Sequence, residues 1–175
     1  MAALNNKAKG ENLWKNTEKV NAEFFSLTYG SLVAQIVKDY EEVDAINAQL
    51  EKMGHNIGVR LIDEFLAKSQ AGRNPCKSNR DIAEVVCKVA FKMFLNINAE
   101  PTNWDADSAF SIVYGDSPLT DFVQLPPHLQ DLHYSNIICG VIRGALEMIQ
   151  IQVEATYVGD KLRGAEQNEI RVVSV

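Results

Sequence analysis

One long predicted helix, with two glycines beside its apolar face and a cysteine just beyond its end, constrains the fold of this chain more than any other segment. Within residues 45–76, apolar side chains recur every three or four positions, the spacing of a single helical face: Ile46, Leu50, Met53, Ile57, Leu61 and Phe65. Gly54 and Gly58 lie four residues apart beside this face. Glycine inside a helix costs about 0.5–1 kcal/mol relative to alanine, so the pair requires a local reason.

Two explanations account for this glycine pair. The first is close packing against a second helix, because glycines let two backbones approach. The second is an opening in the core that admits a molecule other than protein. Gly140 and Gly144 repeat the four-residue spacing in the most hydrophobic predicted helix, which begins at Ser135 and is expected to be buried on almost all sides.

The remaining periodicity predicts a mixed fold. Helical spacing indicates helices over about 23–40 and 43–68 and a third from a cap within 78–81 to about 94, whereas strands are predicted at 98–104, 108–114, 151–158 and 169–175. This order predicts a single α+β domain, in which a helical layer packs on a small twisted antiparallel sheet. Residues 1–20 are polar and lack periodicity, so we expect a flexible N-terminal tail before a domain spanning 21–175.

Charge and cysteine usage exclude several classes of protein. The 175-residue chain has a formal net charge of −6, which disfavours binding to nucleic acid. Its three cysteines lack close spacing, which argues against a disulfide framework and for a reducing compartment. The N-terminus lacks the apolar core of a signal peptide, and no apolar run is long enough to span a bilayer. Any membrane association is therefore expected to be peripheral.

The sequence contains no recognisable catalytic or metal-binding motif. Its cysteines and three histidines do not form a metal-ligand spacing, and the two glycines of 159–164 have the spacing of a phosphate-binding loop but are followed by Ala165 where that loop requires lysine. We therefore predict no metal site, no other cofactor and no enzymatic activity. An enzyme that uses Cys76 as an acyl carrier is a further possibility, but no general base accompanies this residue.

Cys76 differs from the other two cysteines, which lie in hydrophobic helical segments. It lies in a polar stretch with Arg73, Lys77 and Arg80 nearby. Positive charge favours the thiolate, which is the nucleophile for acylation or oxidation. The alternative is an ordinary surface cysteine, and the residues alone leave both interpretations open.

Arg143 and Glu147 are the charged pair of the most apolar helix. Their order is the weaker one for an ion pair between residues four apart, so local helix stabilisation is a poor explanation. They either reach the surface, pair within a structural network or make a specificity contact in a subunit interface.

From residue 24 to residue 173 the sequence resembles the small-subunit family of the transport protein particle (TRAPP), of the Bet-three type. The resemblance is carried by LTYG (27–30), KMGHNIGVRLIDEFLA (52–67), KVAFKMFLNI (88–97), TNW (102–104), DFVQLP (121–126), YSNIICGVIRGALEMIQ (134–150) and EIRV (169–172). These stretches are long and cover the expected domain.

The resemblance implies a core subunit of a vesicle-tethering complex that helps to activate a Rab-type small GTPase in ER-to-Golgi transport. It implies pairing with homologous small TRAPP subunits, a homodimer when isolated, and a cytoplasmic location with peripheral association on cis-Golgi and ER-derived vesicle membranes. It also implies covalent palmitate on a cysteine, for which Cys76 is the candidate although Asn74 and Pro75 separate it from Arg73. Small residues would line the acyl channel, and the candidates are Gly54, Gly58 and Ala90.

A different class of function fits the same features. An apolar cavity in such a domain can bind a free fatty acid or a hydrocarbon reversibly, without a thioester. The hypotheses differ in whether bound lipid depends on Cys76.

Overall fold

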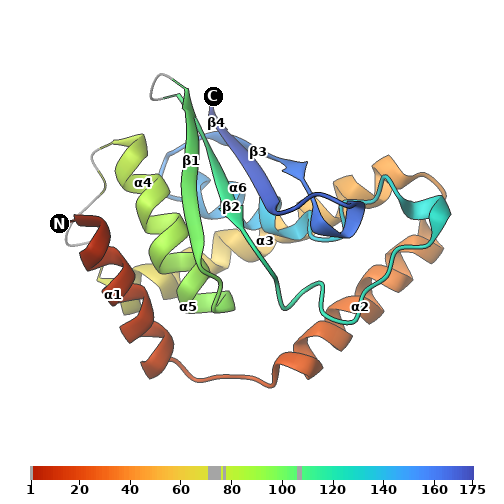
Figure 1. The fold of residues 1–175 in the computed structure, drawn as a ribbon, viewed down its shortest axis with the longest axis horizontal. Helices are drawn as coiled ribbons and strands as arrows, with labels where there is room; N and C mark the ends of the chain where they lie inside the picture. The colour runs from red at the N-terminus through yellow and green to blue at the C-terminus, as the bar shows by residue number, and fades with distance from the viewer. Residues whose placement is uncertain (1, 71–75, 77, 106–107) are drawn as a thin grey trace.

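The computed structural model describes residues 2–70, 76, 78–105 and 108–175. It forms an α+β domain in which helices pack on an antiparallel sheet, as predicted (Figure 1). The helices are α1 (Ala2–Asn16), α2 (Ala22–Asp39), α3 (Val43–Ser69), α4 (Asn79–Val85), α5 (Phe91–Leu95) and α6 (Ile137–Glu147). A π turn (Val86–Ala90) joins α4 to α5, and short 3-10 turns cover Pro127–Leu129 and Lys161–Arg163.

The four strands form one sheet in the order β1-β2-β4-β3, and every neighbouring pair is antiparallel. They are β1 (Ala99–Asp105), β2 (Ala109–Tyr114), β3 (Val153–Gly159) and β4 (Asn168–Ser174). Alternation along β3 places Val153, Ala155 and Tyr157 in the core and the intervening residues outside. All four lie within a residue or two of the predicted segments. Alternation marks β3 and β4, whereas β1 and β2 were predicted from β-forming residues between prolines and glycines.

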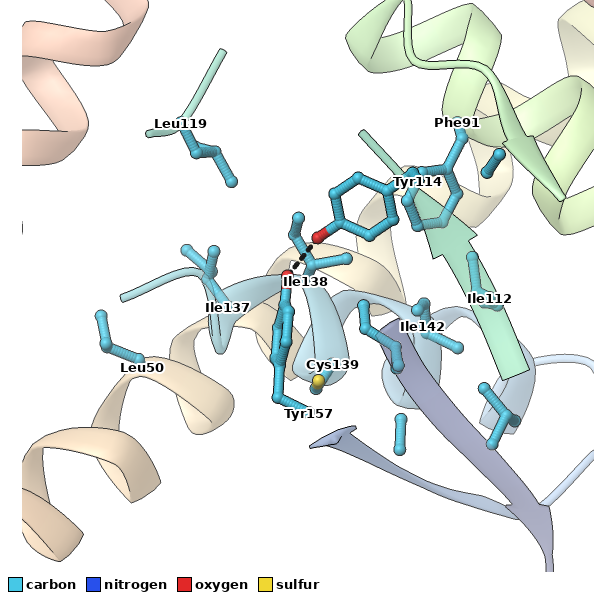
Figure 2. Packing of buried hydrophobic residues seen from close by; sticks show 14 of the residues in the cluster. Leu50, Phe91, Ile112, Tyr114, Leu119, Ile137, Ile138, Cys139, Ile142 and Tyr157 are labelled. Atoms are coloured by element: carbon cyan, nitrogen blue, oxygen red, sulfur yellow. Dashed lines mark hydrogen bonds between the residues drawn. The ribbon is translucent and has the colours of Figure 1, made fainter. Parts of the chain in front are cut away.

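Helix α6 lies at the centre of the main apolar core. Figure 2 shows Ile138, Cys139 and Ile142 of α6 facing the side chains of Tyr114 and Tyr157 from the sheet. The two tyrosine hydroxyl groups form a hydrogen bond with each other inside this core. The pairing satisfies polar groups that would otherwise be buried without a partner. The face of α6 toward the sheet is therefore buried as expected, whereas Arg143 and Glu147 on the same helix are partly exposed.

Helices α3 and α6 pack backbone against backbone through their glycines. A Cβ atom on Gly54 would lie 2.0 Å from the carbonyl oxygen of Ile137, and one on Gly58 would lie 2.2 Å from that of Val141. Gly140 and Gly144 make the reciprocal approach to the α3 backbone. The space beside Gly54 and Gly58 is therefore filled by α6. This corrects the prediction that these two glycines line an acyl channel and supports the alternative of close helix packing.

The N-terminal segment differs from the expected flexible tail. Residues 2–16 form α1, which packs on the π turn and α5 (Figure 1). The sequence lacks a helical stripe there because the contact is made by a glycine, Gly10, and by one leucine, Leu13. The helix therefore depends on tertiary contacts that periodicity does not record.

The third helical segment begins as predicted. The Ser78 hydroxyl group accepts a hydrogen bond from the Asp81 N–H at 3.2 Å, so Ser78 is the N-cap. The expected single helix is instead interrupted by the π turn and ends at Asn96, whose φ of 57° lies in the left-handed region. A π turn adds one residue to a helical turn, and this change in the apolar spacing is too small to distinguish it from a continuous α-helix in the sequence.

Candidate functional site

Cys76 lies between the end of α3 and the start of α4. Of the three cysteines, all within the described residues, it alone is exposed, whereas Cys87 and Cys139 are 0% and 1% exposed. Burial raises the pKa of both core thiols well above the ordinary cysteine value, which keeps them protonated. They act as small apolar residues of the core. A reagent from solution reaches the thiol of Cys76.

The electrostatic surroundings of Cys76 differ from the expected ones. Desolvation by the surrounding chain raises the pKa of the Cys76 thiol, and the negative charge of Asp81 adds to this effect. The positive charge of Lys9 on α1 acts in the opposite direction but does not prevail. The prediction that neighbouring cations favour the thiolate is therefore wrong in its net sign. A protonated thiol is a weaker nucleophile than a thiolate, so these surroundings do not activate Cys76.

The basic residues predicted to activate Cys76 are only partly described. Arg73 and Lys77 lie outside the described residues. The guanidinium carbon of Arg80 lies 5.0 Å from the centroid of the Trp104 ring, which is a cation–π contact. Arg80 is therefore held against the sheet by an aromatic partner.

A second apolar cluster, separate from the main core, lies between α3 and the segment from α4 to α5. Its buried members are Ile62, Phe65, Val89 and Met93, and the partly buried residues around them are Leu13, Leu66, Val85, Ala90, Phe94 and Ala145. The candidate channel residue Ala90 thus belongs to this second cluster, at the end of the π turn. Its role as a channel residue remains a prediction.

Arg143 and Glu147 connect α6 to α3 and do not pair with each other. The guanidinium group of Arg143 pairs with the carboxylate of Glu51, and Glu147 Oε2 lies 2.6 Å from His55 Nε2. Their side chains are 43% and 54% exposed. These contacts fit the structural interpretation made from the sequence. The suggested subunit contact stays a prediction, since the exposed part of each side chain remains accessible.

Helix α2 carries an exposed apolar stripe that sequence analysis did not single out. On α2, Phe24 and Leu27 are 69% and 63% exposed and lie three residues apart on one helical face, and Val20, which is 75% exposed, lies in the segment just before the helix. The opposite face of α2 is buried through residues such as Tyr29 and Val33. The sequence could have predicted this surface, because large apolar residues outside the core-facing stripe of a helix are not needed for the core and mark an interaction surface.

Within the described part of the chain, no helix combines the length and apolar character needed to cross a bilayer. The same residues contain no group of three or more cysteine, histidine or acidic side chains that could hold a metal ion.

Comparison with known proteins gives consistent matches. A family model described as transport protein particle (TRAPP) component matches residues 25–173. Trafficking protein particle complex subunit 3 of Dictyostelium discoideum is 51% identical over 166 residues, covering 94% of this chain and 88% of the relative. Trafficking protein particle complex subunit BET3 of Saccharomyces cerevisiae is 49% identical over 170 residues, covering 95% of this chain and 87% of the relative.

Solved structures agree with the sequence matches. The crystal structure of a trafficking protein particle complex subunit 3 from Naegleria fowleri, covalently bound to palmitic acid, is 55% identical with a TM-score of 0.86 and covers 90% of this chain and 97% of that chain. The phenol-responsive sensory domain of the transcription activator PoxR has a TM-score of 0.59 at 15% identity, a likeness of fold alone. The family match and the curated relatives together establish that the chain belongs to the TRAPP component family.

Proposed function

We propose that this chain is a non-enzymatic core subunit of a TRAPP complex, in which it is a scaffold for homologous small subunits. The match to the TRAPP component family over residues 25–173 is the observation that carries this proposal. Within the assembled complex the subunit contributes to vesicle tethering and to activation of a Rab-type small GTPase in ER-to-Golgi transport. It works on the cytoplasmic side of Golgi and vesicle membranes, with which it associates peripherally.

The exposed stripe of α2 is the surface that we assign to subunit pairing. Phe24 and Leu27 on the helix, with Val20 just before it, are the kind of exposed apolar side chains that anchor protein interfaces. The stripe lies on the side of α2 facing away from the buried Tyr29 and Val33, so a partner can cover it without disturbing the fold. In the isolated chain, two copies would cover the stripe by pairing with each other.

Replacing Leu27 by glutamate is expected to abolish this pairing while the domain remains folded. Glutamate is a good helix former, and the side chain at position 27 is 63% exposed, so the fold tolerates it. A charge buried in an apolar interface without a partner is strongly unfavourable. We expect the homodimer to dissociate in size-exclusion chromatography with light scattering, and co-purification with homologous TRAPP subunits to be lost.

The matched control is Val158→Glu, which adds the same charge on β3 where the side chain is 60% exposed. It should leave the pairing at the wild-type level. Pairing of the Leu27→Glu protein at wild-type affinity would remove the α2 stripe as the interface.

We also propose that Cys76 carries a palmitoyl group through a thioester. Two observations support this: the 55% identical Naegleria fowleri structure is covalently bound to palmitic acid, and Cys76 is the exposed cysteine of this chain. In the reaction, Cys76 Sγ attacks the carbonyl carbon of an acyl thioester such as palmitoyl-coenzyme A. The bond to the sulfur of the donor breaks, and the proton of Cys76 ends on the leaving thiol.

The intact mass of the native protein tests this attachment. We expect an increment of one palmitoyl group that neutral hydroxylamine removes, because hydroxylamine cleaves thioesters. A Cys76→Ala variant should lack the increment, whereas Cys87→Ala should keep it because that thiol is fully buried. The alternative function, reversible binding of a fatty acid or hydrocarbon, predicts lipid that is retained by Cys76→Ala and lost under denaturing conditions.

A further inference from the structure

Helix α1 is seated on the π turn by a backbone contact that leaves no room for a side chain. A Cβ atom on Gly10 would lie 2.1 Å from the carbonyl oxygen of Lys88 and 3.1 Å from Lys92 Cβ. The first distance is far below van der Waals contact, so this seat admits only glycine. Leu13, about one helical turn further on, contacts the second apolar cluster. The helix is thus fitted to this surface at two successive points.

The side chains of α1 lie mostly outside the core, although the helix also touches α3, α4 and α5. Among residues 5–16, whose side chains the structure describes, Gly10 alone is buried. An isolated helix of 15 residues is marginally stable in water, and an interior glycine weakens it further. The connection to α2, residues 17–21, has no regular secondary structure, and residues 18–21 are exposed. Release of α1 from its seat would therefore unfold α1 and leave α2 in place.

The position of α1 relates two features that concern acylation. Through Leu13 it contacts the second cluster, which also contains Ala90, Phe65 and Met93. Through Lys9 it places a positive charge that acts on the Cys76 thiol, where it offsets a small part of the rise in the pKa caused by burial and by Asp81. The family match begins at residue 25, which lies after α1.

We propose that α1 is a releasable strap, which while seated on the π turn restricts the entry of an acyl chain from Cys76 into the second apolar cluster. The proposal rests on the acylation of Cys76 proposed above. Leu13 occupies part of the apolar surface that an entering chain would use, so the seated helix and the chain compete. Such competition is reciprocal: an acylated protein holds α1 less tightly than an unmodified one.

A Gly10→Ala variant of the full chain separates this proposal from a simple effect on helix stability. Alanine is the better helix former, so helix propensity predicts a more stable α1. The contact with the Lys88 carbonyl oxygen predicts the opposite, because the added Cβ cannot fit. Asn5→Ala is the control, since it makes a similar gain in propensity at an exposed position of the same helix.

Hydrogen exchange followed by mass spectrometry reports the seating of α1, and intact mass reports the acylation of Cys76 by palmitoyl-coenzyme A. In Gly10→Ala we expect α1 amides to exchange about tenfold faster and acylation to accelerate severalfold, whereas Asn5→Ala stays at the wild-type values. In wild-type protein, acylation itself should speed exchange in α1. Circular dichroism melting confirms that the domain stays folded.

Two results would overturn the strap. One is unchanged hydrogen exchange of α1 in Gly10→Ala, which would mean that Gly10 does not hold α1 on the π turn. The other is faster exchange with unchanged acylation, which leaves the thioester standing but removes the competition. If neither variant nor wild type is acylated at Cys76, the thioester proposal fails by itself. The strap is then tested by the binding of a fluorescent fatty acid to Cys76→Ala protein and to the Cys76→Ala/Gly10→Ala double variant. Tighter binding to the double variant supports the strap, and equal binding overturns it.

Discussion

Replacing Gly58 by alanine is expected to lower the free energy of unfolding by about 3 kcal/mol or more, the upper part of the range for overpacked cores. The added Cβ would lie 2.2 Å from the carbonyl oxygen of Val141 and 2.8 Å from the Ala145 nitrogen. Both are backbone atoms, so relief requires α3 and α6 to move apart along a seam that both helices share. Intrinsic helix propensity acts in the opposite direction but is worth only about 1 kcal/mol. Urea denaturation of the purified protein measures the change.

The control for this substitution is Gly115→Ala. A Cβ at that position meets nothing within 4 Å, so the free energy of unfolding should stay unchanged or rise slightly. Gly144→Ala, which would place a Cβ 2.2 Å from the carbonyl oxygen of His55, should behave like Gly58→Ala. A Gly58→Ala protein more stable than wild type would contradict the close packing and restore an open space beside α3.

The contrast between these glycines shows which parts of the fold could be predicted from the sequence. Alternation along β3 and β4 and helical spacing in α2 and α3 record a buried face directly, so those elements could be placed within a few residues. The spacing of Gly54 and Gly58 indicated a special contact but not its partner. The reciprocal pair on α6 fills that contact, a fact that depends on where the two helices cross in space.

Helix α1 and the π turn could not be placed in the same way. The interactions of α1 come from Gly10 on a backbone carbonyl and from Leu13, which leaves no periodic stripe to detect. The polar composition of residues 1–20 predicted a flexible tail, because composition reports only how much apolar side-chain surface a segment can bury. A helix that docks through its backbone is invisible to that measure.

The exposure of Cys76 was predicted from the sequence, whereas the contact made by Gly54 and Gly58 and the sign of the pKa shift of Cys76 were not. Cys76 stood out because the other two cysteines lie in apolar helices, and the structure agrees with that separation. The sign of the pKa shift could not be read from the basic residues nearby in sequence. Desolvation and the carboxylate of Asp81 prevail, and Arg80 is in contact with Trp104. The apolar stripe of α2 was not predicted, because its exposure depends on which face of α2 packs against the core.

Replacing Ala90 by leucine is expected to exclude the acyl chain and thereby prevent stable acylation of Cys76. Ala90 is a small residue at the edge of the second apolar cluster, next to the fully buried Val89. A chain that enters this cluster gains about 0.8 kcal/mol for each methylene group removed from water, or roughly 10 kcal/mol if all of a palmitoyl chain is enclosed. A leucine side chain would occupy that path. Intact mass after incubation with palmitoyl-coenzyme A should show little or no increment.

Ala90→Ser is the matched control, because it keeps nearly the same volume and leaves the path open. It should be acylated at a rate close to wild type, and both variants should unfold in urea with a single transition. If the folded Ala90→Leu protein is acylated as fast and as completely as wild type, the chain does not pass Ala90 and the second cluster is not its binding site. If both variants lose acylation equally, volume is not the cause, and the role of Ala90 is to shape the π turn instead. Only loss in the leucine variant alone supports an acyl chain enclosed by the protein, where it stabilises the fold and cannot also anchor the subunit in a membrane.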